Sequence, residues 1–114
     1  MSDCIFCAVA AHEMPATFVR EDDDVLAIRD VNPQAPTHVL VLPREHITSA
    51  AHLTAAHASL WNRMLVMVQE IARNEGLEEG GYRLVVNIGR QGGQTVDHLH
   101  VHLLGGRQMT WPPG

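Results

Sequence analysis

The sequence predicts an α+β fold, with a mainly antiparallel five-stranded sheet, one long helix and one short helix. Alternating apolar segments outnumber segments with helical spacing, and Pro and Gly residues fall between them. Of the 114 residues, 46% are hydrophobic, which suits one compact core but leaves too few residues for two. We therefore expect a single domain over residues 1–114.

Five segments have the composition and spacing of strands. The first two flank the acidic run Glu21-Asp22-Asp23-Asp24, which is typical of a solvated hairpin turn rather than a metal site. The third follows a proline-containing stretch that interrupts the pairing. The predicted strands cover residues 16–20, 25–30, 37–42, 82–88 and 96–104.

Two helices are predicted in the middle of the chain. Thr48 or Ser49 can cap the short helix, and Thr54 can cap the long one, which reaches about Asn74. Glycines at 76, 80 and 81 end this helix and permit the return to a strand. The apolar face of the long helix, which we interpret as core, comprises Leu60, Met64, Val68 and Ile71.

Charge and hydropathy argue against two classes of partner. The formal net charge is −5, and no basic stripe is present that could neutralise a phosphate backbone, so we expect no nucleic-acid partner. No apolar run is long enough to span a bilayer, and the start of the chain lacks the pattern of a secretion signal. We expect a cytoplasmic protein with no membrane partner.

Three histidines alternate with apolar residues in the last predicted strand. Successive strand residues point to opposite faces, so His98, His100 and His102 share one face and the intervening Leu99 and Val101 face the core. Gathering three titratable rings on one face destabilises a fold, so the arrangement indicates a ligand, a metal or a reaction that uses them.

A glycine-rich loop at residues 89–95 precedes the histidines. The backbone N–H groups of 92–95 (Gly-Gly-Gln-Thr) can approach an anion closely, although tight turns between strands produce the same composition. An imidazole that attacks a phosphoryl group forms a phosphoramidate bond, which water later cleaves. The loop and the histidines together therefore favour phosphoryl chemistry.

Cys4 and Cys7 have the spacing of a metal knuckle near the N-terminus. In a reducing compartment such a pair is metal-binding or redox-active more often than it is a structural disulfide. Two thiolates are half of a tetrahedral set, and the available partners are His46 and one end of the histidine triad. The alternatives are reduced thiols with a surface His46, or a redox pair, which the lack of a βαβ context disfavours.

The segment 98–104 resembles the His-apolar-His-apolar-His-apolar-apolar signature of the histidine triad (HIT) family. Residues 30–38, Asn87, residues 92–95 and the ending 105–114 resemble its nucleotide-binding phosphoramidase branch. Nearly the whole chain is covered by this resemblance, which implies a HIT-like fold. Asp97 departs from the family, which more often has an aromatic residue there.

The resemblance implies five catalytic residues. His100, the middle histidine of the triad, is the nucleophile, and His102 binds the phosphate with it. His38 and Asn87 lie near the phosphate, and His38 supports the orientation and tautomer of the nucleophile. Thr95 stands where the family usually has a serine that hydrogen-bonds the leaving group, a capacity that threonine keeps.

The resemblance also implies a nucleotide site, a metal site and a homodimer. Asp30 binds the ribose hydroxyls, and three apolar residues enclose the purine, of which Ile5 and Phe6 could equally be ordinary core. Trp111, in the C-terminal tail, reaches towards the partner's site, and the sheet continues across the dimer interface. The full nucleotide-binding set is Ile5, Phe6, Val9, Asp30, Val31, Asn87, Gly93, Gln94, Thr95, His100, His102 and Trp111, and the structural zinc set is Cys4, Cys7, His46 and His98.

The function that these roles imply is hydrolysis of purine nucleoside 5′-phosphoramidates, such as adenosine phosphoramidate or adenylated lysine. The reaction passes through a nucleotidyl-His100 intermediate and needs no catalytic cofactor. Alternatives are hydrolysis of diadenosine polyphosphates and a nucleotide-binding regulatory module without significant turnover. A further alternative makes the three triad histidines a metal cluster.

Overall fold

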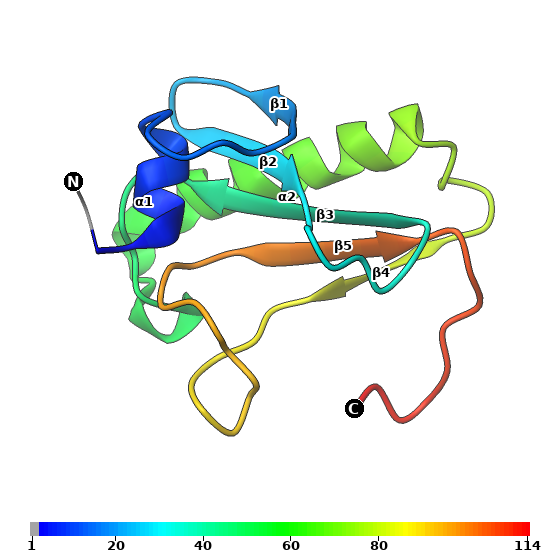
Figure 1. Ribbon diagram of the computed structural model, residues 1–114. Helices are drawn as coiled ribbons and strands as arrows, with labels where there is room; N and C mark the ends of the chain where they lie inside the picture. The colour runs from blue at the N-terminus through cyan, green and yellow to red at the C-terminus, as the bar shows by residue number, and fades with distance from the viewer. Residues whose placement is uncertain (1–2) are drawn as a thin grey trace.

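In a computed structural model that describes residues 3–114, five strands form one antiparallel sheet of order β1-β2-β3-β5-β4 (Figure 1). This confirms the predicted α+β class and the predicted sheet. The strands are β1 (Phe18–Glu21), β2 (Val25–Arg29), β3 (Thr37–Pro43), β4 (Tyr82–Val85) and β5 (Val101–Gly105).

The acidic run forms the turn between β1 and β2. Asp22 Oδ1 accepts the backbone N–H groups of Asp24 and Val25, each at 2.8 Å. The Asp22 N–H in turn donates to the Val25 carbonyl at 2.9 Å. A short carboxylate side chain that bonds to the backbone ahead of it is a common way of closing a turn, so the predicted hairpin is confirmed.

The central strands β2 and β3 are buried on both faces, so their residues do not show the exposure pattern of a half-buried sheet. On one face, helix α2 (Ala58–Asn74) packs against alternate residues of β2, β3 and β5. On the other face, helix α1 (Ile5–Ala10) packs against the remaining residues. Figure 1 shows α2 crossing behind the sheet and α1 at one end of the strands.

The segment before α2 differs from the predicted short helix. It contains two 3₁₀ turns, η1 (Ala50–His52) and η2 (Ala55–His57), whose N-caps are the side chains of Ser49 and Thr54. Leu53, with φ −70° and ψ 143°, is extended and separates the two turns. The first turn therefore ends at Leu53, whereas η2 leads directly into α2, which begins at Ala58.

Helix α2 provides the core as predicted. Met64, Met67, Val68 and Ile71 are buried, and Leu60 packs against the same cluster. At the C-terminal end, the N–H of Leu77 donates to the carbonyl of Ala72 at 2.9 Å, while Gly76 adopts φ +74°. Glycine reaches this left-handed conformation without strain, which explains the end of the helix.

Helix α1 is not predicted by the sequence pattern. It has only six residues, and the side chain that caps it belongs to Cys4, whose Sγ accepts the N–H of Cys7 at 3.4 Å. Cysteine is not among the usual N-cap residues, and a single short helix gives little periodicity. Phe6 and Val9 of this helix are buried, which places it firmly on the sheet.

The last two strands are shorter than predicted. Strand β5 begins at Val101, because the N–H of Leu99 donates to the carbonyl of Ile47 at 2.6 Å instead of pairing with β3. Strand β4 ends at Val85, where it pairs with His102. His98 and His100 therefore precede the strand, although they retain the alternation that turns Leu99 towards α2. None of the helices within residues 3–114 is long and apolar enough to cross a membrane.

Candidate functional site

A cavity of about 650 Å³ lies on the face of the sheet that carries α1. Its volume is typical of a pocket for a small ligand. Six apolar residues, from α1, β2, β3 and the segment before the triad, form much of its wall: Ile5, Phe6, Val9, Ile28, Leu40 and Val96. Its polar lining includes Asp30, Thr95, His100 and His102. The apolar part of the cavity thus lies beside the imidazoles of His100 and His102.

The ring of His100 is held in one tautomer. Its Nδ1 lies 2.7 Å from the backbone carbonyl oxygen of His98. A carbonyl can only accept, so in the neutral ring Nδ1 carries the proton and Nε2 has the lone pair. Phe6 packs edge-on against the ring, with centroids 5.1 Å apart, and the side chain is buried. His100 therefore has the nucleophilic form of imidazole in a fixed orientation.

A chain of three hydrogen-bonding groups fixes the tautomer of His102. The backbone N–H of Gln34 donates to His38 Nδ1 at 3.0 Å, so the proton of neutral His38 lies on Nε2. His38 Nε2 lies 2.9 Å from His102 Nδ1 and must donate to it. The proton of neutral His102 is therefore on Nε2, which makes this ring a hydrogen-bond donor at the cavity.

Both members of this histidine pair favour the neutral state. Burial, together with the neighbouring His100 and His38 rings, lowers the pKa of His102 to about 4, although Asp30 opposes this shift. Burial also lowers the pKa of His38, again opposed by Asp30. At neutral pH these imidazoles are thus uncharged, as the hydrogen-bond chain requires.

The structure changes the role expected for His38. The atom that orients the nucleophile is the carbonyl oxygen of His98, at 2.7 Å from His100, and not a side chain. His38 instead contacts His102, because the pairings Leu40–His102 and His38–Leu104 make the two histidines diagonal neighbours on one face. His38 therefore acts on the ring expected to bind phosphate.

Asp30 lies at the end of β2, beside this pair. Its Oδ1 accepts the N–H of Asn32 at 2.8 Å, and its Oδ2 lies 3.4 Å from His38 Nε2. Its side chain is 19% exposed, and it lines the cavity together with Val31, which is almost fully exposed. A carboxylate here remains able to accept from hydroxyl groups of a ligand.

Gln94 braces the glycine-rich loop. Its Oε1 accepts the N–H of Gly89 at 2.9 Å, and its Nε2 donates to the carbonyls of Thr48 at 2.7 Å and Val96 at 3.1 Å. These contacts use both N–H groups of the amide. The side chain expected to bind nucleotide is thus engaged with the backbone around it, and it holds the loop that carries Thr95.

Asn87 and two glycines shape the same loop. Asn87 Nδ2 donates to the Gly92 carbonyl at 2.7 Å. A Cβ at Gly92 would lie 2.2 Å from the carbonyl oxygen of Ile88, so only glycine fits. The N–H groups of Gly93 and Gln94 donate within the loop, to Arg90 and Gly89, and do not point to an anion site. The expected role of these two amides in anion binding is therefore not supported by the geometry.

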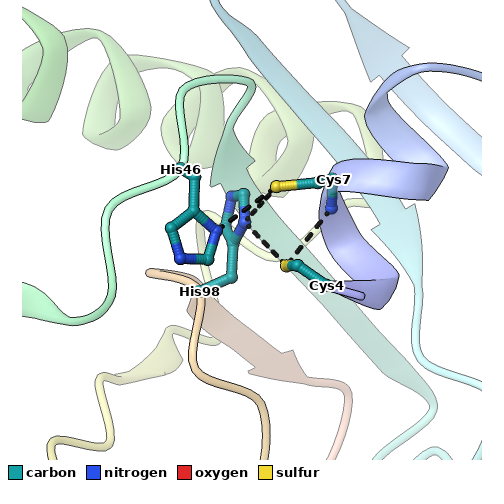
Figure 2. Close-up of side chains that lie close together, drawn as sticks. All are labelled: Cys4, Cys7, His46 and His98. Atoms are coloured by element: carbon teal, nitrogen blue, oxygen red, sulfur yellow. Dashed lines mark hydrogen bonds between the residues drawn. The ribbon is translucent and has the colours of Figure 1, made fainter. Parts of the chain in front are cut away.

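The predicted metal set comes together as expected. His98 Nδ1 lies 3.3 Å from Cys4 Sγ and 3.5 Å from Cys7 Sγ, and His46 Nδ1 lies 3.3 Å from Cys7 Sγ (Figure 2). The four donor atoms all lie within 4.8 Å of one another. His98 Nε2 donates to the Pro43 carbonyl at 2.8 Å, so Nδ1 presents its lone pair to the two sulfurs.

These residues fit a tetrahedral zinc ion. Zinc binds sulfur at about 2.3 Å and nitrogen at about 2.0–2.1 Å, so a tetrahedron places each sulfur about 3.5 Å from each nitrogen. The three sulfur–nitrogen distances of 3.3, 3.3 and 3.5 Å agree with this value. The carbonyl partner of His98 is the kind of outer contact that orients a metal-binding imidazole.

A second cluster of possible ligands is Asp30, His38 and His102. Its possible ligand atoms lie close enough together to bind a metal ion, but its hydrogen bonds are incompatible with one. A metal on His38 Nε2 would move the proton to Nδ1, which already faces the N–H of Gln34. Two opposed donors are unfavourable, so we interpret this cluster as a hydrogen-bond chain.

The sequence interpretation missed part of the cavity wall. Ile28 and Leu40 are directly paired neighbours in β2 and β3, and both line the cavity. Their signal was available, since two-residue alternation places Ile28 on the same face as Asp30 and Leu40 on the same face as His38. The loop 14–17 also lines the cavity and carried no such signal.

Trp111 stands apart from the cavity within this chain. Its side chain is 83% exposed, and it lies in the tail that follows β5. The tail is held to the sheet by Arg83, which donates to the Thr110 carbonyl at 2.8 Å. Contact between Trp111 and a nucleotide on a second subunit remains a prediction.

Comparisons with known proteins agree with this geometry. The sequence profile of the HIT domain matches residues 11–109. An uncharacterized HIT-like protein of Synechococcus elongatus is 54% identical, with 98% of this chain and 97% of that protein covered. A 14 kDa zinc-binding protein of Zea mays is 49% identical over 99% and 89% of the two chains. A protein named adenylylsulfatase HINT1 of Arabidopsis thaliana is 47% identical over 99% and 78%.

Solved structures are also similar to this chain. A HIT family hydrolase from Legionella pneumophila has 51% sequence identity and a TM-score of 0.97, with 98% of this chain and 100% of that chain covered. A histidine triad nucleotide-binding protein from Candida albicans has 29% identity and a TM-score of 0.82, with 96% and 83% covered. The similarity therefore extends over the sheet and both helices.

Proposed function

The chain belongs to the HIT family, and from this premise we propose that it hydrolyses purine nucleoside 5′-phosphoramidates through a nucleotidyl-His100 intermediate. The observation that carries the proposal is the 2.7 Å hydrogen bond from His100 Nδ1 to the His98 carbonyl, which leaves Nε2 as a nucleophile at the cavity. The apolar wall of the cavity suits a purine, and Asp30 suits the ribose hydroxyls.

The first step forms a bond between His100 Nε2 and phosphorus and breaks the bond between phosphorus and the amine nitrogen. His102 Nε2–H donates to a phosphate oxygen, where charge gathers in the transition state. The Thr95 hydroxyl, which lines the cavity, hydrogen-bonds the departing amine and passes it a proton from solvent. The His100 ring becomes cationic, and the His98 carbonyl stabilises it through the Nδ1–H bond.

The second step releases the nucleotide. Water attacks the phosphorus, the bond to His100 Nε2 breaks, and the ring returns to its neutral form with the proton still on Nδ1. The attacking water loses one proton to solvent, and the products are a nucleoside monophosphate and an amine. The enzyme thus divides one difficult displacement into two easier ones.

The test is hydrolysis of adenosine 5′-phosphoramidate by the wild type and by His100→Gln, with adenosine monophosphate quantified. We expect the variant to lose at least about a hundredfold in turnover while it still binds adenosine monophosphate. His52→Gln is the matched control, because His52 is exposed on η1 and should keep wild-type turnover. Tight nucleotide binding without wild-type turnover would favour a regulatory binding module instead.

A second candidate leaving group is sulfate. The Arabidopsis relative is named an adenylylsulfatase, and adenylyl sulfate shares the adenosine and the α-phosphate of the proposed substrate. The same His100 attack would break a phosphorus–oxygen bond instead of a phosphorus–nitrogen bond. Parallel assays with the two substrates and with a diadenosine polyphosphate would rank the three candidates.

We also infer that Cys4, Cys7, His46 and His98 hold a structural zinc ion. Four protein ligands close the coordination sphere, so the ion would tie the N-terminal helix to the sheet and would not activate water. The zinc-binding name of the maize relative supports this assignment. Thiolate ligands require a reducing compartment, which supports the cytoplasm as the location.

A homodimer is the remaining element of the proposal. Strand β4 lies at one edge of the sheet, and its Tyr82 and Leu84 side chains are 37% and 40% exposed. An exposed apolar edge strand favours pairing with another chain. Pairing of two β4 edges would continue the sheet, and light scattering on the eluting protein would measure the mass.

A further inference from the structure

Helix α1 belongs to two sites at once. Cys4 caps the helix and Cys7 lies in its first turn (Figure 2). Ile5 and Phe6, which lie between them in the sequence, line the cavity. The Phe6 ring packs edge-on against His100, with centroids 5.1 Å apart, and it also contacts the His98 ring. Any rearrangement of the two thiols therefore also moves the part of the cavity wall that contacts His100, the proposed nucleophile.

The two sulfur atoms lie close together. Cys4 Sγ and Cys7 Sγ are 3.3 and 3.5 Å from the same atom, Nδ1 of His98, and they lie within 4.8 Å of each other. A disulfide has a sulfur–sulfur distance of about 2.0 Å, so the closure shortens their separation by less than about 3 Å. Both side chains are half-buried, which leaves them accessible to a small oxidant.

We propose that Cys4 and Cys7 form a peroxide-sensitive dithiol, whose oxidation to a disulfide expels the metal and loosens the cavity wall. One thiolate attacks hydrogen peroxide, the oxygen–oxygen bond breaks, and a sulfenic acid and one water form. The second thiolate attacks the sulfenic sulfur, the disulfide forms, and a second water leaves. Two thiolates thus lose two electrons to one peroxide, and two protons from solvent complete the two waters.

The effect on the metal site follows from ligand number. The disulfide removes both sulfur ligands and leaves the imidazoles of His46 and His98, which are only half of a tetrahedral set. We therefore expect the oxidised protein to release zinc completely. The backbone of His98 also holds the ring of His100, so loss of the metal affects the same segment that orients the nucleophile.

The effect on the cavity follows from the position of α1. This helix contributes Ile5, Phe6 and Val9 to the wall, and its ordered start depends on the Cys7 N–H bond to Cys4 Sγ. Oxidation alters that hydrogen bond and at the same time removes the metal that links α1 to His46 and His98. We expect adenosine monophosphate to bind roughly tenfold more weakly, because part of an apolar wall loses its fixed position.

This role differs from that of a catalytic dithiol. The two cysteines face a metal-binding histidine, and no strand–helix–strand unit surrounds them in the part of the chain that the structure describes. A catalytic dithiol oxidises or reduces a separate substrate, and the proposed role of Cys4 and Cys7 includes no such substrate. The pair instead makes zinc occupancy and nucleotide binding depend on the oxidant concentration.

The experiment treats the full, zinc-loaded chain with hydrogen peroxide. Peptide mapping detects a Cys4–Cys7 disulfide, a chromogenic chelator measures released zinc, and calorimetry measures the affinity for adenosine monophosphate. We expect one zinc released per disulfide formed, together with the loss of affinity. A dithiol reductant with added zinc should restore both, which separates this reaction from methionine oxidation, because thiols do not readily reverse that lesion.

Two variants control the interpretation. Cys4→Ser keeps only one thiol and should form no intramolecular disulfide. His46→Gln removes an exposed imidazole ligand but keeps both thiols, so it should bind zinc more weakly and form the disulfide faster than the zinc-loaded wild type. Since His46 is exposed, this variant is expected to fold.

The outcomes are distinguishable from those of the hydrolysis assay. Oxidation to isolated sulfinic acids without a disulfide would overturn the proposal, as would a disulfide that leaves zinc bound or nucleotide affinity unchanged. Mass, zinc release and monophosphate affinity do not depend on which substrate the enzyme hydrolyses. Failure of the phosphoramidase activity alone would leave all three readouts measurable.

Discussion

His98 and His100 are linked by a hydrogen bond from the Nδ1–H of the second ring to the backbone carbonyl of the first, at 2.7 Å. The same residue, His98, directs its side chain to Cys4 and Cys7. Two-residue spacing thus connects the proposed zinc ligand His98 to the proposed nucleophile His100 through one peptide group. The metal site and the cavity are separate in composition but share this short segment of backbone.

The tautomers of the histidines are the first prediction. His100 should carry its proton on Nδ1, whereas His38 and His102 should carry theirs on Nε2, because a carbonyl acceptor and an N–H donor fix the two ends of the hydrogen-bond network. Long-range proton–nitrogen correlation spectra at neutral pH distinguish the two forms. An Nε2–H tautomer at His100 would contradict the nucleophile assignment.

Stability should decrease in mildly acidic solution. Burial lowers the pKa of His102 from 6.5 to about 4 and also lowers that of His38, so the unfolded chain binds protons at a pH where the folded chain does not. Below the unfolded pKa the free energy of unfolding therefore falls as the pH falls, down to about pH 4. Urea denaturation across this range measures the change.

His102→Gln provides the control for the pH experiment. The variant lacks the imidazole, so its free energy of unfolding should depend less steeply on pH over the same interval. Both proteins should be measured with a chelator present, since protonation also releases metal from histidine and cysteine ligands. Equal pH dependence in the two proteins would assign the effect to other groups.

Removal of zinc should affect stability more than chemistry. A chelator should lower the thermal midpoint of the reduced protein by at least about 8 °C, the shift that a loss of about 2 kcal/mol produces in a domain of this size. Turnover measured well below the new midpoint should fall less than about tenfold, because the closed site activates no water. Complete loss of turnover would instead support a catalytic metal cluster.

The sequence predicts the elements that have a repeated pattern. The hairpin around Asp22 and the long helix were predictable because alternation, helical spacing and turn chemistry agreed. Helix α1 was not, since six residues give little periodicity and its cap is the thiol of Cys4. The late start of β5 depends on the carbonyl of Ile47, a distant residue whose position no local pattern indicates.

The same distinction applies to the site. The alternating histidines and the cysteine pair were visible as spacings, and the structure brings the predicted metal set together. The pairing of His38 with His102 was not visible, because it depends on the register of β3 against β5 and on the N–H of Gln34. Side-chain contacts that depend on how two strands are aligned can be identified only in the folded structure.

Gln94 gives a prediction about the loop. Replacement by leucine removes three hydrogen bonds to backbone groups and should lower the free energy of unfolding by about 1–3 kcal/mol. Gln91→Leu, at an exposed position of the same loop, should change it by less than about 0.5 kcal/mol. Denaturant titration of both variants measures the difference. Weaker nucleotide binding by Gln94→Leu at unchanged stability would assign Gln94 to the nucleotide itself.

Thr95 distinguishes the two candidate leaving groups. An amine must gain a proton as it departs, whereas sulfate leaves as a stable anion, so only the amine requires the Thr95 hydroxyl. Thr95→Val keeps the shape of the side chain and should slow phosphoramidate turnover by about 10- to 100-fold. The same variant should change turnover of adenosine 5′-phosphosulfate by less than about threefold, because proton delivery makes little contribution there.

Thr95→Ser is the matched control for this comparison, since it retains the hydroxyl and removes only the methyl group. Turnover of the phosphoramidate by this variant should stay within about threefold of the wild type, and steady-state assays of released adenosine monophosphate measure all three proteins. Equal losses on both substrates in Thr95→Val would show that the residue positions the phosphate and not the leaving group. A serine variant as slow as the valine variant would show that loss of the hydroxyl does not explain the effect, because Thr95→Ser retains the hydroxyl.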